Sequence, residues 1–177
     1  MKRHALAAVL SLLITGTALA QAPAGTAAPV APNAAFEPYV GQPGKDVIWV
    51  PTPDAVIARM LDIAKATPTD FLIDLGSGAG RTVIAAGKRG MRAMGVEFNP
   101  DMVALSNREA QKQGVADKVK FVNGDIFATD FTQANIVTMY LLPSLNLKLR
   151  PTLLDMKPGT RVVSHAFTMG DWEPDET

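Results

Sequence analysis

The sequence contains no cysteine and only two histidines among its 177 residues. The absence of cysteine excludes a cysteine nucleophile, an iron–sulfur cluster, a thiolate zinc site and any disulfide. The sequence also lacks an excess of positive charge, because Lys plus Arg and Asp plus Glu number 17 each. No basic field is available to hold a long stretch of nucleic acid. We therefore predict neither a nucleic-acid partner nor a metal site.

The first part of the chain lacks acidic residues and has the pattern of a secretory signal peptide. A basic start at residues 2–4 is followed by an apolar run over residues 5–15 and by Ala18-Leu19-Ala20. The run is too short to remain in a bilayer as a permanent span. We predict a signal peptide over residues 1–20, cleaved after Ala20, and an exported, periplasmic protein without a stable membrane span. If the signal is not used, the protein is cytoplasmic.

Charge is also scarce in the next segment. Residues 21–38 are rich in alanine and proline and cannot bury a core. We predict a flexible linker there and a folded domain over residues 39–177.

Apolar patterns with the spacing of strands and helices alternate through this domain, which predicts an α/β fold with a parallel sheet. Thr52 is expected to cap the first helix, with Pro53 as its first residue. Strands are predicted at residues 71–75, 93–97, 119–122, 136–140 and 161–167, and helices after Pro53, over 80–88 with Gly90 as C-cap, from Asn99 to Gly114 and, broken around Pro151, over 145–154.

A glycine-rich turn after the first predicted strand carries the strongest functional signal. Gly76, Gly78 and Gly80 allow a tight turn and a close approach of the backbone to a ligand. Asp74, Glu97 and Asp125 follow three successive strands, and ligands of open α/β sheets bind at the carboxyl ends of the strands. A carboxylate in the position of Glu97 can accept hydrogen bonds from two ribose hydroxyls.

The glycine turn does not match a dinucleotide site. Arg81 stands where the last glycine of a G-x-G-x-x-G motif is expected, and Asp74 would repel a pyrophosphate. A cationic amino-acid ligand suits this acid better. S-adenosylmethionine has an ammonium, a sulfonium and no phosphate, so the electrostatics favour it over NAD.

Together the turn, Glu97 and Asp125 resemble motifs I to III of class I S-adenosylmethionine-dependent methyltransferases. The wider pattern consists of Val50-Pro51-Thr52-Pro53, Gly76-Ser77-Gly78, Gly80-Arg81, Glu97-Phe98-Asn99-Pro100 and Asp171-Trp172-Glu173-Pro174-Asp175. It is similar to a small family of seven-strand protein-lysine N-methyltransferases and its exported bacterial relatives. This resemblance implies a Rossmann-like, doubly wound, mainly parallel sheet with helices on both faces.

Two departures from that family have consequences. Ala79 replaces the aspartate usual there, which predicts weaker cofactor binding. The complete fold has a sixth and a seventh strand, whereas this chain ends at Thr177, just after the predicted fifth. We expect a sheet without its last two strands, either because the sequence is truncated or because another copy completes the sheet.

The resemblance also implies roles for individual residues. The glycine turn would wrap the methionine part of the cofactor, Asp74 would orient its ammonium, and Glu97 would bind the ribose. Asp125 and the backbone of Ile126 would bind the adenine edge, while Pro51 and Thr52 would close over the methyl-donor end. The implied cofactor-binding residues are Pro51, Thr52, Asp74, Gly76, Ser77, Gly78, Gly80, Glu97, Asn99, Asp125 and Ile126.

The predicted activity is in-line transfer of a methyl group from S-adenosylmethionine to a protein lysine or a similar small-molecule amine. Tyr140, after the fourth strand, is the candidate catalytic residue, with packing at a strand end as the other interpretation. His165 is expected to be a core residue rather than a catalytic one. Trp49 and Trp172 are expected to pack against the domain, with the wall of an acceptor channel as the other interpretation for either. Two other functions stay open, an inactive module that binds S-adenosylmethionine and an NAD-type oxidoreductase. The sequence does not specify the acceptor, the degree of methylation or the oligomeric state.

Overall fold

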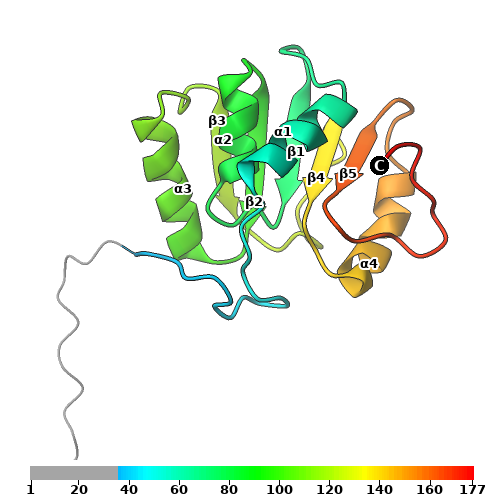
Figure 1. Ribbon diagram of the computed structural model, residues 1–177, viewed down its shortest axis with the longest axis horizontal. Helices are drawn as coiled ribbons and strands as arrows, with labels where there is room; N and C mark the ends of the chain where they lie inside the picture. Colours follow the sequence, from blue (N-terminus) through cyan, green and yellow to red (C-terminus); the bar gives the residue numbers. More distant parts are fainter. Residues whose placement is uncertain (1–35) are drawn as a thin grey trace, which may run out of the picture. The chain divides into compact units, whose positions relative to one another are not determined.

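The computed structural model describes residues 36–177, so the predicted signal peptide and nearly all of the predicted linker lie outside the described residues. The described chain forms one sheet in which every pair of neighbouring strands is parallel (Figure 1). This confirms the predicted α/β class and parallel sheet. The strands are β1 (Phe71–Leu75), β2 (Arg92–Glu97), β3 (Val119–Asn123), β4 (Ile136–Met139) and β5 (Arg161–Ser164), in the order β3-β2-β1-β4-β5.

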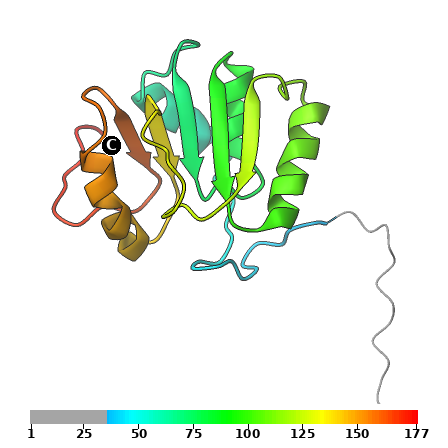
Figure 2. The same ribbon diagram turned by 180° about the vertical axis from the view of Figure 1, so that it is seen from behind.

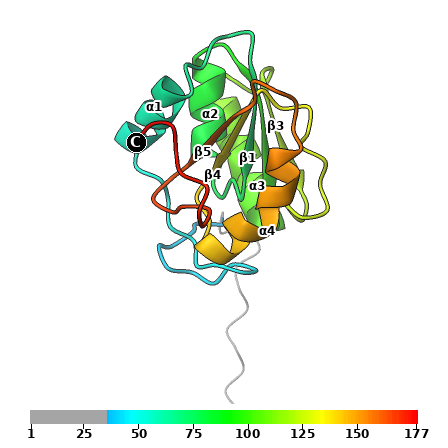
Figure 3. The same ribbon diagram turned by 90° about the vertical axis from the view of Figure 1, so that its right-hand side faces the viewer.

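Helices cover both faces of the sheet, as expected (Figures 2 and 3). Three of them share one apolar core with the sheet, while the fourth packs on the other face beside the loop that follows β3. The central strands are covered on both sides, which explains why all four residues of β4 are buried. The helices are α1 (Asp54–Ile63), α2 (Arg81–Lys88) and α3 (Pro100–Lys112) on the first face and α4 (Pro143–Leu154) on the second.

Local capping explains three of the eight helix boundaries. Asn99 caps α3, since its side-chain oxygen accepts a hydrogen bond from Asp101 N at 2.9 Å. Gly90 and Gly114 follow α2 and α3 with φ of +85° and +70°, the left-handed conformation that ends many helices. These predicted boundaries are confirmed.

Two other helix predictions were wrong. The N-cap of α1 is Pro53, with no side-chain capping bond, so the Thr52 hydroxyl is free for another contact. Helix α4 is not broken at Pro151 but runs through it from Pro143. Pro151 leaves the carbonyl of Leu147 without its helical partner, and both residues lie on the exposed side, where water can replace the missing bond.

Strand β5 is shorter than predicted because the chain turns sharply after Ser164. Ala166 has a φ of +64°, and Phe167 N donates a hydrogen bond to His165 O at 2.8 Å. The Ser164 hydroxyl closes the same turn by donating to Phe167 O at 2.6 Å. After this turn the chain leaves the sheet and packs against the helices, since Arg150 of α4 donates to Met169 O at 3.3 Å and Arg59 of α1 donates to Glu176 at 3.1 Å.

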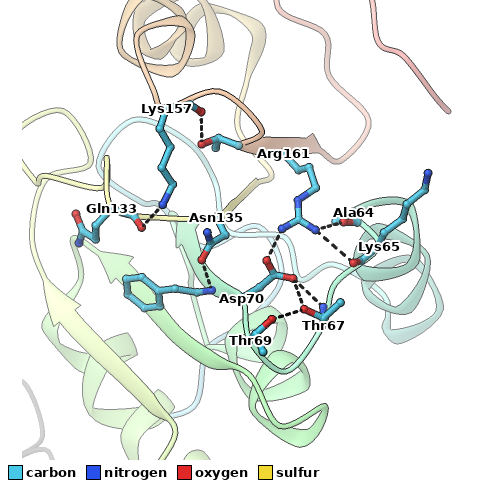
Figure 4. Close-up of polar contacts among 11 residues, drawn as sticks. Ala64, Lys65, Thr67, Thr69, Asp70, Gln133, Asn135, Lys157 and Arg161 are labelled. Carbon is cyan, nitrogen blue, oxygen red and sulfur yellow. Dashed lines mark hydrogen bonds and ion pairs between the residues drawn. The ribbon is translucent and has the colours of Figure 1, made fainter.

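A polar network joins α1, β1 and β5 at the amino ends of the strands (Figure 4). The buried Asp70 carboxylate accepts hydrogen bonds from Thr67 N at 2.8 Å and from Arg161. Arg161 also donates to Ala64 O at 2.8 Å, at the end of α1. Burial alone would raise the pKa of Asp70, but the bonds from Thr67 and the Arg161 guanidinium outweigh it and lower the pKa.

Strand β5 forms one edge of the described sheet, as expected from the absence of a sixth and a seventh strand. Its Arg161 and the following His165 donate their N–H groups to β4 and its flank. The alternation of a strand directs the backbone groups of Val162 and Ser164 toward the free edge. Within residues 36–177, no helix is long and apolar enough to cross a membrane.

Candidate active site

A pocket of about 300 Å³ lies at the carboxyl ends of the strands. It spans the point where the strand order reverses between β1 and β4, which is where open α/β sheets bind their ligands. The segment before α1 crosses these strand ends and supplies one wall (Figure 1). We call this segment, residues 42–52, the strap.

The glycine turn forms the floor of the pocket beside α2. Gly76, Gly78 and Gly80 have φ of +76°, +52° and +78°, a region that side chains with a Cβ rarely adopt. A Cβ on Gly78 would come within 2.6 Å of the Trp49 indole nitrogen of the strap. The turn therefore requires glycine for its backbone conformation and for the close packing of the strap.

Asp74 lies at the end of β1 and is buried beneath this turn. Its carboxylate accepts a hydrogen bond from the Thr138 hydroxyl of β4 at 2.6 Å. Burial, helped by the nearby negative charge of Glu97, raises the pKa of Asp74 to about 7, although the Thr138 bond opposes the shift. Ionised Asp74 is therefore a buried negative charge that a cationic ligand would stabilise.

Glu97, at the end of β2, organises the backbone on two sides of the pocket. One carboxylate oxygen accepts from Gly78 N and the other from Asn99 N, each at 2.8 Å. These bonds hold the carboxylate in a fixed orientation while its remaining lone pairs stay available to donors such as hydroxyl groups.

Asp125 follows β3 at the far end of the pocket. Its carboxylate accepts from Lys45 Nζ of the strap at 2.6 Å and from Phe127 N at 2.9 Å. The Lys45 bond is the main cause of the lowered pKa of Asp125. Lys45 also lies 4.8 Å from the centre of the Phe98 ring, so the strap is attached on the same side by an ion pair and a cation–π contact.

Three aromatic rings meet at the other end of the pocket. The Tyr140 ring centre is 4.0 Å from that of His165 and 5.9 Å from that of Phe167. The Thr52 hydroxyl, which does not cap α1, lies 3.4 Å from His165 Nδ1. His165 is half-buried at this rim, so its predicted place in the core was wrong.

The structure brings nearly all of the sequence-predicted site residues to one pocket. Gly78 and Gly80 are the exceptions, because Trp49 covers Gly78, and Gly80 packs against Phe121 and Ser106. The buried Ser77 hydroxyl has no hydrogen-bond partner among the described residues. The predicted residues that line the pocket are Pro51, Thr52, Asp74, Gly76, Ser77, Glu97, Asn99, Asp125, Ile126 and Tyr140.

Sequence reasoning missed most of the strap and the residues that follow β5. Apart from Trp49 and Val50, residues 42–50 fall before the first periodic helix and have no pattern that marks them as a wall. The sequence signal was the presence of the apolar residues Ile48 and Val50 in a segment rich in glycine, proline and charge. The structure leaves both side chains exposed, as is typical of a binding surface. Phe167 was assigned to a strand, and its place at the pocket depends on the turn at Ala166.

Most of the pocket residues lie in a segment that matches a known protein family. The family model described as the ANTKMT methyltransferase domain matches residues 74–176, from the acid below the glycine turn to the segment after β5. The chain belongs to this family. It is a class I methyltransferase that uses S-adenosylmethionine, and the NAD-type alternative is set aside.

Individual relatives support the same assignment. A "Protein-lysine N-methyltransferase" of Saccharolobus islandicus (strain REY15A) is 43% identical over 133 residues, covering 73% of this chain and 83% of that protein. The "Adenine nucleotide translocase lysine N-methyltransferase" of Mus musculus is 32% identical over 139 residues, covering 77% and 56%. This methyltransferase thus spans little more than half the length of that mouse relative.

A solved structure gives the fold and the cofactor class together. An RNA methyltransferase from Salinibacter ruber, in complex with S-adenosyl-L-homocysteine, superposes with a TM-score of 0.69 at 52% identity, covering 71% of this chain and 84% of that one. A methyltransferase from Geobacter sulfurreducens in complex with the same compound has a TM-score of 0.56 at 19% identity and is a relative in fold alone.

Proposed function

We propose that this enzyme methylates the ε-amine of a lysine in a protein acceptor. One observation carries the proposal. The pocket has three carboxylates, Asp74, Glu97 and Asp125, along one end and an aromatic rim at Tyr140 on the other. The first end suits a cationic nucleoside, and the second suits an alkyl amine. Relatives named as lysine N-methyltransferases support this choice of acceptor.

Each carboxylate of the pocket can be paired with one polar part of S-adenosylmethionine. Asp74, ionised, would attract the ammonium of the methionine part, and Glu97 would accept hydrogen bonds from the ribose hydroxyls. Asp125, with the backbone of Ile126, would bind the adenine edge, a role that requires Lys45 to share the carboxylate. When bound, the cofactor supplies a methyl carbon that its sulfonium has already activated for displacement.

The protein residues have three tasks in this reaction. They must hold the amine in line with the methyl group at about 3–3.5 Å, exclude water and favour the neutral amine. Lysine has a reference pKa of about 10.4, and an apolar surrounding lowers it without a dedicated base. Leu141, Leu142 and Phe167 supply such a surrounding beside Tyr140.

Calorimetric titration of S-adenosylmethionine into the parent and Glu97→Ala proteins tests the cofactor site. We expect micromolar-range binding that the substitution weakens at least 10-fold, about 1.4 kcal/mol. Glu109→Ala on α3, at a residue that does not line the pocket, is the matched control and should bind like the parent. Equal affinity of all three proteins would contradict the assigned role of Glu97.

The acceptor class requires a second experiment, because the Salinibacter ruber relative is named an RNA methyltransferase. Lys plus Arg and Asp plus Glu are equal in this sequence, which favours a protein acceptor over a polyanion. Radiolabelled S-adenosylmethionine should label a lysine-containing peptide, and acid hydrolysis should release methyl-lysine. An Arg-for-Lys peptide is the control. Label in a structured RNA but not in the peptide would contradict the proposal.

We also propose that residues 1–20 direct export and are removed after Ala20. The basic start, the apolar run and the small residues before Gln21 support this proposal. Mass spectrometry of the protein isolated from periplasmic and cytoplasmic fractions provides the test. An N-terminus at Gln21 in the periplasmic fraction is expected, and an intact N-terminus confined to the cytoplasm would contradict it.

A further inference from the structure

A second cavity, of about 840 Å³, lies beside the free edge of β5, between α1 and the chain that follows β5. We call it the β5 groove. Met60 and Phe167 line both this groove and the cofactor pocket. His165 lines the groove, and Tyr140, whose ring it contacts, lines the pocket. The aromatic cluster of Tyr140, His165 and Phe167 therefore stands where the two cavities meet.

The backbone that carries two of these rings is held in an uncommon conformation. Ala166, between His165 and Phe167, has a φ of +64°, which costs energy for a residue with a Cβ. The buried Asn146 of α4 compensates by donating its side-chain N–H groups toward Phe167 O at 3.4 Å and Thr168 O at 3.2 Å. Strain of this kind persists where the surrounding structure fixes it, and it is concentrated at ligand sites.

The strap contacts the cluster on the pocket side. The Thr52 hydroxyl lies 3.4 Å from His165 Nδ1 and can fix the plane of the imidazole. Burial lowers the pKa of His165, so the ring is neutral near pH 7 and adds no positive charge beside the Tyr140 and Phe167 faces. An alkylammonium group is attracted by such ring faces, most strongly where water is excluded.

Resting on the proposed lysine methylation, we propose that the aromatic cluster is the acceptor seat. The acceptor side chain enters from the β5 groove, and its amine lies against the rings of Tyr140 and Phe167. His165 acts as a positioning residue, held by Thr52 and stacked on Tyr140. The relatives' names specify lysine but assign no residues to its binding, whereas this geometry assigns Tyr140, His165 and Phe167.

Direct binding of a lysine side-chain analogue tests the seat without any turnover. The full chain is saturated with S-adenosyl-L-homocysteine and titrated with n-butyltrimethylammonium, with n-butanol as the uncharged control, while the imidazole proton signals are followed by NMR. We expect saturable shifts of the His165 signals with the cation and shifts at least five-fold smaller with n-butanol. The His165 signals are assigned by their loss in His165→Gln.

The same titration with Tyr140→Leu should reduce the His165 shifts at least five-fold while S-adenosyl-L-homocysteine affinity, measured by calorimetry, stays within two-fold. Equal shifts with the cation and n-butanol, or shifts unchanged by Tyr140→Leu, would overturn the seat. The binding measurement does not depend on methylation of a lysine peptide. A failure to methylate such a peptide would contradict the proposed function and not the acceptor seat.

Steady-state kinetics with a lysine peptide then separates positioning from structure. His165→Leu should raise the acceptor KM at least five-fold and leave the S-adenosylmethionine KM within two-fold. His165→Gln, which retains a polar group for Thr52, should recover part of the loss. An equal effect on both KM values, or none on either, would show that His165 does not position the acceptor.

Discussion

Asp74 combines burial with a need for charge. It sits at the end of the most central strand, beneath the glycine turn, and its side-chain partner is the neutral Thr138 hydroxyl. A carboxylate in such a place prefers to be protonated, which explains a pKa of about 7. The position is therefore unfavourable for stability at neutral pH but suited to a ligand that brings an ammonium, a trade-off common at functional sites.

Replacement of Asp74 by asparagine should make the pH dependence of stability flatter. The pKa of Asp74 is higher in the folded protein than the ordinary 3.8, so the folded state binds the extra proton and its free energy of unfolding falls as the pH rises from 4 to about 7. The full loss approaches about 4 kcal/mol. Between pH 5 and pH 8, the free energy of unfolding measured in urea should fall by about 3 kcal/mol less for Asp74→Asn than for the parent. Parallel curves for the two proteins would contradict the raised pKa.

Glycines with positive φ are not equivalent, and two of them form a matched pair. Gly114, after α3, has open space around its Cβ position, so Gly114→Ala should cost only the backbone strain of about 1 kcal/mol. A Cβ on Gly80 would approach Phe121 at 2.6 Å and Ser106 at 2.9 Å. Gly80→Ala should therefore cost at least about 2 kcal/mol more in chemical denaturation, since overpacking adds to the strain. Equal costs would show that the packing around Gly80 yields.

At the scale of elements, the sequence predicted what depends on local chemistry. The parallel strands, the Asn99 cap and the glycines that end α2 and α3 were identified because their signals lie within a few residues. Thr52 was misassigned because a hydroxyl before proline has the local pattern of a cap, while its partner, His165, is 113 positions away in the sequence. Most of the strap and the grouping of His165 and Phe167 around Tyr140 escaped prediction for the same reason, since they are defined by contacts between distant segments.

The network around Asp70 lies far from the pocket, so we expect it to contribute to stability and not to ligand binding. Arg161→Ala would leave the buried Asp70 carboxylate with its Thr67 bonds and remove the link to the end of α1. We expect a loss of about 2 kcal/mol, less than for a fully buried pair because Arg161 is partly exposed. Lys157→Ala removes one exposed hydrogen bond to Gln133 O (Figure 4). Its loss of stability should be only a few tenths of the loss expected for Arg161→Ala.

Both variants should bind S-adenosylmethionine with unchanged affinity, because the network lies at the amino ends of the strands and the pocket at the carboxyl ends. Urea unfolding and calorimetry together make the comparison. A stability loss for Arg161→Ala no larger than that of Lys157→Ala would show that the Asp70 contact is not a stabilising one.

At the scale of the whole molecule, the pocket joins walls that come from nearly the entire described chain, from Gln42 to Phe167. A ligand bound there stabilises the folded state by mass action, by about 2.7 kcal/mol at 100 times its Kd. For a domain of this size, the thermal midpoint should rise by roughly 6–10 °C with S-adenosylmethionine or S-adenosyl-L-homocysteine. NAD at the same concentration is the control, and an equal rise with NAD would contradict the ligand preference argued from Asp74.

The contacts of the strap have a consequence for the order in which the chain folds during its synthesis. Lys45 and Thr52 are among the first residues of the domain to be synthesised, yet their partners Asp125 and His165 follow 80 and 113 positions later. Contacts between such distant segments form late, after the strands and helices between them are in place. A nascent chain can thus assemble most of the sheet before the strap has formed its contacts with Asp125 and His165. Competence to hold the ligand is acquired in the last moments of maturation, and a chain halted before His165 would build the floor of the site without closing it.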